Sequence, residues 1–125
     1  MLSLTSSHIY YFHRGITDMR KSFDGLCQLV QQELKRNPMS GEVYIFMGRQ
    51  RNTLKLLHWE QGGFVLYYKR LELGTFEMPK FDQSTCNYQI KWTDLVFMLE
   101  GISLGSIKHR KRFSSKSCVD KFVNK

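Results

Sequence analysis

The chain has 125 residues, of which 42% are hydrophobic and 14% aromatic, and it carries a formal net charge of +8. This length suits one domain with one hydrophobic core, and the composition excludes an intrinsically disordered chain. No apolar run approaches the ~20 residues that a membrane-spanning helix needs, and the first residues lack the features of a secretory signal. Three cysteines without C-x-x-C spacing are typical of free thiols in a reducing compartment. We therefore expect a cytoplasmic protein without membrane contact.

The positive charge is concentrated at the C-terminal end of the chain. Residues 1–107 hold 12 Lys and Arg against 10 Asp and Glu, whereas residues 108–125 hold 7 against 1. We therefore expect a single domain over residues 1–105 and a basic, flexible tail over residues 106–125. Such a tail can bind polyanions without sequence preference, and it can equally be a solvated segment that aids solubility.

The first third of the chain predicts a strand followed by a long helix. Residues 8–13 (HIYYFH) are aromatic and β-branched, which is typical of a strand. Apolar residues then recur at helical spacing, and the sequence predicts a helix over residues 18–36. Its apolar stripe consists of Met19, Phe23, Leu26, Cys27, Val30 and Leu34. Pro38 disfavours helical backbone at the residue before it, so residues 37–41 are predicted to form a turn.

The middle of the chain predicts three strands joined by short turns. Residues 42–47, 53–60 and 64–72 are rich in β-branched, aromatic and aliphatic residues. Glycine-containing segments separate them at residues 48–52 and 61–63. Because these connections are short, the three strands are expected to form an antiparallel meander.

The C-terminal part of the domain predicts less regular structure. Residues 73–88 contain glycine, proline and few aliphatic residues, as a loop or edge segment does. Residues 89–92 predict one more short strand, and residues 93–101 a short helix with Thr93 as its cap and Gly101 at its end. The predicted fold is α+β, an antiparallel sheet of four to five strands packed against one long and one short helix.

Neither face of the central hairpin is cleanly polar. Because side chains alternate along a strand, one set is predicted to face the long helix: Leu54, Leu56, Leu66 and Tyr68. The opposite face is predicted to carry Lys55, Trp59, Tyr67 and Lys69. The two helices could cover one face of the sheet and leave the other partly open. There, aromatic rings beside cations could stack bases and hold phosphates, or anchor a protein partner. The alternative is that the rings fill the core while the cations extend to water.

No pattern in the sequence points to catalysis. The four histidines show no H-x-x-x-H or H-E-x-x-H spacing, and neither G-x-S-x-G nor a phosphate-binding G-x-x-x-x-G-K-[ST] occurs. Asp18 and Asp24 lie on different faces of the predicted helix, where they are poorly placed to share a metal. We therefore predict a protein that is not an enzyme and that has no cofactor and no metal site.

Four stretches, taken together, resemble one protein family. They are TDMRKSFDGL (17–26), NPMSG (37–41), KLLHWEQGGFVLYYKRLE (55–72) and LEGI (99–102). The chain resembles, over residues 8–104, the TnpB-type accessory proteins that the IS66 family of bacterial insertion sequences encodes as a second open reading frame product. The chain departs from the usual family pattern at Ile16, where proline is common, and at Met78, where tryptophan is common.

The resemblance implies an accessory role in transposition, beside a separate, larger transposase that carries the acidic catalytic residues. It supplies no catalytic residue for this chain. We expect the protein to bind DNA without catalysis. The alternative is a protein-interaction module that docks the transposase or another element-encoded subunit and does not bind DNA directly. The candidate DNA-binding residues are Arg20, Lys21, Arg49, Arg51, Lys55, Trp59, Tyr67, Lys69, Arg70, Lys108, Arg110, Lys111 and Arg112.

Overall fold

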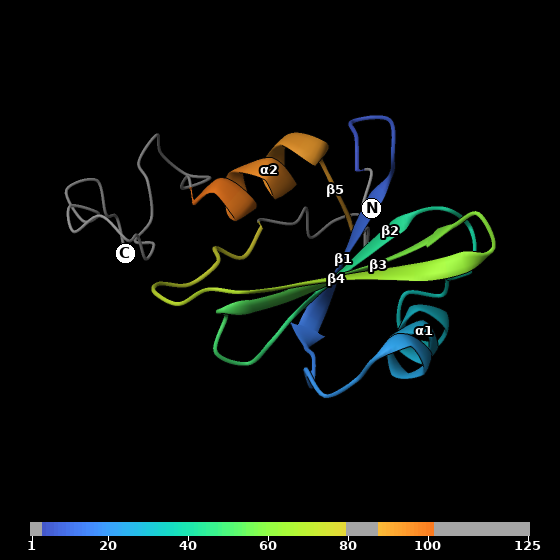
Figure 1. Ribbon diagram of the computed structural model, residues 1–125, viewed down its shortest axis with the longest axis horizontal. Coiled ribbons are helices and arrows are strands. Elements are labelled where there is room, and N and C mark those ends of the chain that lie inside the picture. The colour runs from blue at the N-terminus through green and yellow to red at the C-terminus, as the bar shows by residue number, and fades with distance from the viewer. Residues whose placement is uncertain (1–3, 80–87, 102–125) are drawn as a thin grey trace.

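A computed structural model describes residues 4–79 and 88–101 of the protein (Figure 1). Its elements in chain order are β1 (Tyr10–Ile16), α1 (Phe23–Gln32), β2 (Val43–Met47), β3 (Thr53–Glu60), β4 (Gly63–Arg70), β5 (Gln89–Ile90) and α2 (Trp92–Glu100). The fold is α+β, as the sequence predicts. Among the helices of the described ranges, none has the length and apolar character needed to cross a membrane.

The five strands form one mixed sheet in the order β4-β3-β2-β1-β5. The meander of β2, β3 and β4 is antiparallel, as predicted. The prediction of a purely antiparallel sheet is wrong, because β1 and β2 run parallel. The helix α1 lies between these two strands in the chain and carries it back to the end where β1 began, which is the connection that parallel neighbours require.

The two helices cover opposite faces of the sheet, so the expectation that both could cover one face is not met (Figure 1). Alternate strand residues point to α2, whose Leu95 and Met98 are fully buried against them. The intervening residues point to α1, whose Leu26 and Val30 are fully buried on that side. A sheet covered on both faces explains why neither face of the central hairpin is cleanly polar.

The helix α1 spans ten residues and α2 nine, so the predicted contrast between a long and a short helix is not observed. Residues 18–22 form a turn instead of the first helical turn. The backbone N–H of Arg20 donates to Oδ1 of Asp18 at 2.9 Å, and the N–H of Lys21 donates to the Asp18 carbonyl at 3.0 Å. An aspartate that binds its own backbone in this way favours a turn over a helix. At the other end α1 stops well before Pro38, and Lys35 adopts a left-handed φ of 57°.

The hairpin between β3 and β4 has a two-residue turn, whereas the sequence suggests a three-residue turn over 61–63. Glu60 pairs with Gly63, and the turn residues Gln61 and Gly62 have φ values of 51° and 85°. Two positive φ values in succession are typical of a type I′ turn, which matches the twist of a hairpin. The shorter turn shifts the register by one residue, so Tyr67 lies opposite Leu56 instead of sharing a face with Lys55.

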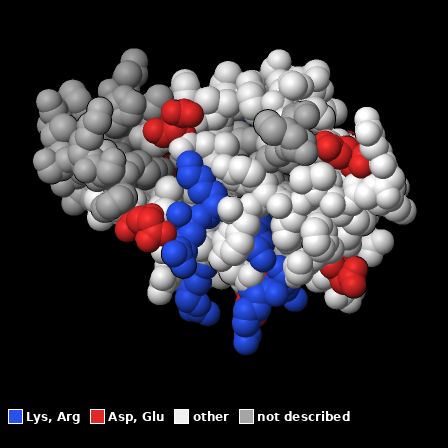
Figure 2. Space-filling view, viewed as in Figure 1, with Lys and Arg blue, Asp and Glu red and all other residues white. Residues whose placement is uncertain are grey.

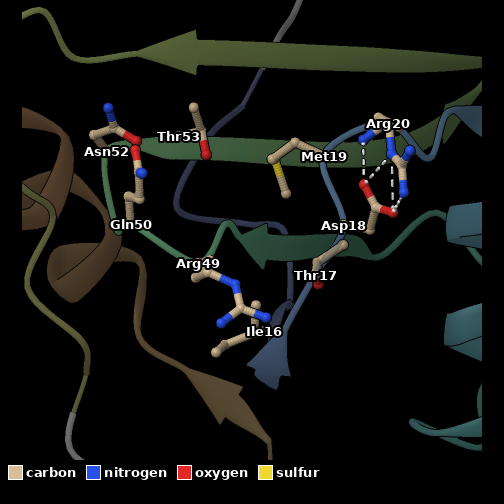
Figure 3. Close-up of a pocket in the computed structure, with 9 residues that line it drawn as sticks. All are labelled: Ile16, Thr17, Asp18, Met19, Arg20, Arg49, Gln50, Asn52 and Thr53. Atoms are coloured by element: carbon tan, nitrogen blue, oxygen red, sulfur yellow. Dashed lines mark hydrogen bonds and ion pairs between the residues drawn. The ribbon is translucent and has the colours of Figure 1, made fainter.

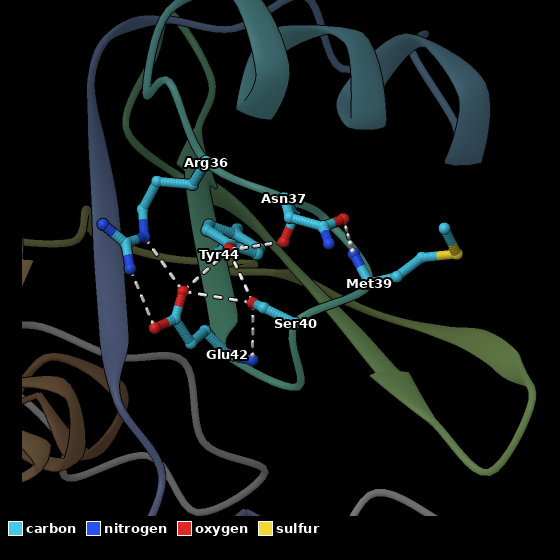
Figure 4. A network of polar contacts seen from close by, with 6 residues as sticks. All are labelled: Arg36, Asn37, Met39, Ser40, Glu42 and Tyr44. Atoms are coloured by element: carbon cyan, nitrogen blue, oxygen red, sulfur yellow. Dashed lines mark hydrogen bonds and ion pairs between the residues drawn. The ribbon is translucent and has the colours of Figure 1, made fainter.

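A polar network fixes the chain between α1 and β2 (Figure 4). The guanidinium of Arg36 donates to both carboxylate oxygens of Glu42 at 2.9 and 3.0 Å, and it lies 4.2 Å from the ring centroid of Tyr11. Tyr44 donates its hydroxyl to the carbonyl of Asn37 at 3.0 Å, and Ser40 donates to Glu42 at 3.1 Å. The segment NPMSG therefore serves to position β2 beside β1.

The hairpin turn gives the first prediction. Gln61→Asn should raise the free energy of unfolding by about 0.5 kcal/mol, because asparagine tolerates the left-handed conformation better than glutamine. Gly62→Ala should lower it by about 1 kcal/mol, because a side chain is strained at a φ of 85°. Urea unfolding of both variants measures the two effects. Equal effects of the same sign would contradict the two-residue turn.

The network at Glu42 gives a prediction on pH. Burial raises the pKa of Glu42, but hydrogen bonds from Arg36, Tyr44 and Ser40 outweigh that effect and bring the pKa below its ordinary value of 4.5. A carboxylate with a lowered pKa stabilises the fold above its unfolded pKa, and this contribution is lost as the pH falls through the folded value. Glu42→Gln should therefore cost about 1–2 kcal/mol at pH 7 and less near pH 3.

Urea unfolding at both pH values measures this difference. Glu100→Gln, at an exposed position at the end of α2, is the matched control. A cost at Glu42 that is the same at pH 7 and at pH 3 would show that its charge contributes nothing to the network.

Candidate nucleic-acid interface

A hollow of about 630 Å³ lies where β1 ends and β3 begins (Figure 3). Its lining comes from the segment that follows β1 and from the turn between β2 and β3. The lining residues are Ile16, Thr17, Asp18, Met19, Arg20, Arg49, Gln50, Asn52 and Thr53. Gly48 is required at the base of this turn, because a Cβ there would collide with Oγ1 of Thr53 and lie 2.9 Å from Cγ of Met19. The close approach of the two segments therefore depends on a glycine.

Arg20 stands at the rim of the hollow, held by Asp18 (Figure 3). Its Nε donates to Oδ1 at 3.1 Å and its Nη2 donates to Oδ2 at 2.8 Å. Hydrogen bonds from the Arg20 side chain and backbone hold the pKa of Asp18 well below its usual range. The Arg20 side chain is 91% exposed, so the pair fixes the direction of a solvated cation instead of burying it.

Further cations lie around the same end of the sheet, and Figure 2 shows Lys and Arg gathered on one part of this face. Arg49 lines the hollow, and Arg51 is exposed in the same turn. Arg70 lies opposite Thr53 in the β3–β4 ladder and pairs with Glu72 at 3.1 Å. Arg20 and Arg49 thus line one hollow although they are distant in sequence, and Arg70 lies on the strand next to its Thr53 wall.

Lys55, by contrast, is a structural residue and does not belong to this surface. It is 5% exposed, and its ammonium donates to the carbonyls of Met19 and Lys21 at 2.8 and 2.7 Å. The ammonium also lies 4.7 Å from the ring centroid of Tyr68. Burial lowers the pKa of Lys55, and the charge of Asp18 opposes that effect. Lys55 therefore ties β3 to the segment that carries Arg20.

The predicted face shared by Lys55, Trp59, Tyr67 and Lys69 does not exist. The one-residue shift of the hairpin places Lys55 and Trp59 on the α1 side, and Tyr67 and Lys69 on the α2 side. Nζ of Lys69 donates to the carbonyl of Leu99 at 3.4 Å, near the C-terminal end of α2. Tyr67 packs against the core on that side, and Trp59 is half-buried with its ring edge-to-face on Phe64, 4.9 Å between centroids.

The remaining candidates divide into two groups. Lys21 is half-buried beside Arg20, and its carbonyl is one of the two that Lys55 binds. The tail residues Lys108, Arg110, Lys111 and Arg112 lie outside the described residues.

Sequence reasoning missed the amides Gln50 and Asn52, which line the hollow, and Tyr68, which is 53% exposed. Gln50 and Asn52 alternate with Arg49 and Arg51 in the sequence, so their polar signal was present there, whereas Tyr68 was predicted to face the long helix.

Within the described ranges, no group of three or more His, Cys, Asp or Glu side chains could hold a metal ion. The side chains that line the hollow offer charge and hydrogen bonding. Guanidinium groups bind phosphate in a bidentate manner, and amide side chains can read base edges.

The role of Lys55 gives a stability prediction. Lys55→Met keeps the apolar stem but removes the donor to two backbone carbonyls, so it should lower the free energy of unfolding by about 2–4 kcal/mol. Arg49→Ala, at an exposed position beside the same hollow, should change it by no more than about 0.5 kcal/mol. Urea unfolding of both variants measures the difference. An unchanged stability in Lys55→Met would mean that water replaces the ammonium without cost.

Comparison with known proteins identifies the family. The family described as "IS66 Orf2 like protein" matches residues 8–109. The chain is similar to uncharacterized protein y4hO of Sinorhizobium fredii (strain NBRC 101917 / NGR234), with 38% identity over 70% of this chain and 75% of that protein. It is also similar to uncharacterized protein y4jC of the same strain, with 32% identity over 50% of this chain and 53% of that protein. No solved structure matches. The chain therefore belongs to the IS66 Orf2-like family, the accessory proteins of IS66 insertion sequences.

Proposed function

We propose that this accessory protein binds DNA without catalysis, beside a separate transposase, through the surface around the hollow. The observation that supports the proposal is the convergence of cations from three separate segments of the chain. Arg20 and Lys21 follow β1, Arg49 and Arg51 occupy the β2–β3 turn, and Arg70 ends β4. Phosphates attract such a cluster of cations.

The charge balance sets the strength of the proposed binding. Of the five cations, Arg20 is paired with Asp18 and Arg70 with Glu72, which leaves a net charge of about three. A surface that neutralises about three phosphates gives a slope of log K against log salt near −3. The basic tail would add further, sequence-independent contacts. We therefore expect weak, salt-sensitive binding from the surface alone.

The amides in the hollow refine this proposal. Gln50 and Asn52 flank the exposed Arg51, in a turn that projects from the sheet. Arginine positions a protein on the phosphates, whereas glutamine and asparagine can hydrogen-bond adenine edges. In this arrangement Arg49 and Arg51 bind the backbone, and the two amides supply any preference for sequence.

Docking of the transposase remains the alternative function. It was expected to need an exposed apolar patch around Trp59 or Tyr67. Both side chains are half-buried, and Tyr67 packs against the core on the α2 side. Among the large apolar residues of the described ranges, Ile16 is more exposed, at 64%, and lines the hollow. A docking partner that used Ile16 would therefore compete with DNA for the same surface.

The DNA-binding proposal predicts the effect of removing two arginines. Arg49→Ala with Arg51→Ala should weaken binding to duplex DNA and make the salt slope shallower by about 2, since each phosphate contact contributes about 0.9. Lys35→Asn with Lys91→Ala removes the same charge elsewhere, at exposed positions, and is the matched control. Fluorescence anisotropy over a range of salt concentrations measures both slopes.

Substituting Gln for Lys108, Arg110, Lys111 and Arg112 in the full chain separates the tail from the surface. If the double arginine variant and its control have equal slopes, the surface does not bind DNA. If DNA binding is equal but only the arginine variant loses co-purification with the transposase, the docking function is the correct one.

A further inference from the structure

The strand β4 is an edge strand of the described sheet, with a regular ladder to β3 and mostly apolar residues. It lies at the end of the sheet order, and of the described elements only β3 pairs with it. All eight of its residues pair with β3 in register, without a bulge. Its sequence GFVLYYKR contains no proline and places both its charges at one end. Edge strands are normally protected by charge, proline or bulges, so an edge of this kind is suited to pairing with another strand.

We propose that two copies of the protein pair through their β4 edges, antiparallel, around a twofold axis at Leu66. The proposal follows from which backbone groups are free. The N–H of Leu71 donates to the carbonyl of Asn52 at 2.7 Å, so the odd-numbered residues of β4 direct their backbone groups toward β3. The even-numbered residues, among them Phe64, Leu66 and Tyr68, direct theirs outward and can pair with a second copy.

The alternation of side chains limits the register of such a pair. Opposite residues in an antiparallel pair point to the same face of the sheet. In a twofold pair of identical strands, one residue must therefore lie opposite its own copy. A centre at Tyr67 would place Arg70 opposite Phe64 and Lys69 opposite Val65, which sets charges against apolar side chains. A centre at Leu66 avoids both contacts.

With Leu66 at the centre, the side chains across the axis are complementary. Phe64 lies opposite Tyr68, whose ring is 53% exposed in the single chain, and Val65 lies opposite Tyr67. Lys69 lies opposite Gly63, and a Cβ on Gly63 would meet nothing within 4 Å, so the space beside it is open. Glu60 pairs with Gly63 in β3 and points to the same face, so the Lys69 side chain can reach Glu60 across the glycine.

This pairing also fits the proposed DNA surface, and this step rests on that proposal. Thr53 lines the hollow and lies four residues from the axis, on the neighbouring strand. Strand geometry then separates the two copies of Thr53 by roughly 30 Å, close to the ~34 Å of one turn of duplex DNA. Because the axis is perpendicular to the sheet, the Thr53 side chains of both copies lie on the same face of the joined sheet.

Sedimentation of the full-length protein without DNA tests the pairing itself, so its result does not depend on DNA binding. We expect a dimer at micromolar concentration. In a background with all three native cysteines changed to serine, Leu66→Cys should form a disulfide-linked dimer under mild oxidation, since paired residues bring their Cα atoms to about 5.5 Å. Tyr67→Cys, one residue away on the same edge, is the matched control and should link poorly.

A charge exchange provides a second test that leaves the apolar edge intact. Lys69→Glu should weaken the dimer several-fold through repulsion from Glu60 of the second copy, and adding Glu60→Lys should restore it. Circular dichroism verifies that each variant is folded. If the protein is a monomer at all concentrations, the proposal is wrong. A strand of another protein would then be the remaining partner for the β4 edge. A dimer that links through Tyr67→Cys, or through neither cysteine, would overturn the register and with it the proposed axis.

Discussion

The buried ammonium of Lys55 is the interaction on which the candidate surface depends. It belongs to β3, in the middle of the sheet, yet it binds the carbonyls of Met19 and Lys21 in the segment that follows β1. A buried charge is tolerated only when hydrogen bonds compensate for lost water, and here two carbonyls and the ring of Tyr68 do so. The same bonds hold the segment that follows β1 against β3, and so they keep Arg20 beside the hollow.

The family motifs consequently have separate physical roles. In TDMRK, Asp18 and Met19 shape the turn and the wall of the hollow, whereas Arg20 is solvated. The polar residues of NPMSG have a structural role. Ser40 donates a hydrogen bond to Glu42, and the carbonyl of Asn37 accepts one from Tyr44. In the hairpin motif, most apolar residues pack on the two faces of the sheet, and of its basic residues only Arg70 belongs to the proposed DNA surface. A charged motif residue is therefore not by itself a binding residue.

The sequence predicted the parts of the fold that depend on local pattern. The meander followed from short turns between three apolar strands, and the end of α2 followed from Gly101, which adopts the expected left-handed conformation. The parallel pairing of β1 with β2 is non-local, since nothing in either strand specifies its partner's direction. The hairpin register depended on Gln61 accepting a positive φ, which glutamine disfavours. The hollow joins the ends of strands that are not consecutive, so only the topology reveals it.

The limited charge of the surface and the open edge of β4 have a common consequence. Asp18 and Glu72 neutralise two of the five cations around the hollow, so one copy would hold only a few phosphates. Two weak surfaces on one rigid dimer act at a high effective concentration toward each other, and the combined affinity then greatly exceeds that of either. Such a dimer would discriminate by the spacing of two contacts along the duplex more than by the bases at each one. Under the proposed function, such a dimer would mark a DNA site without either copy binding tightly.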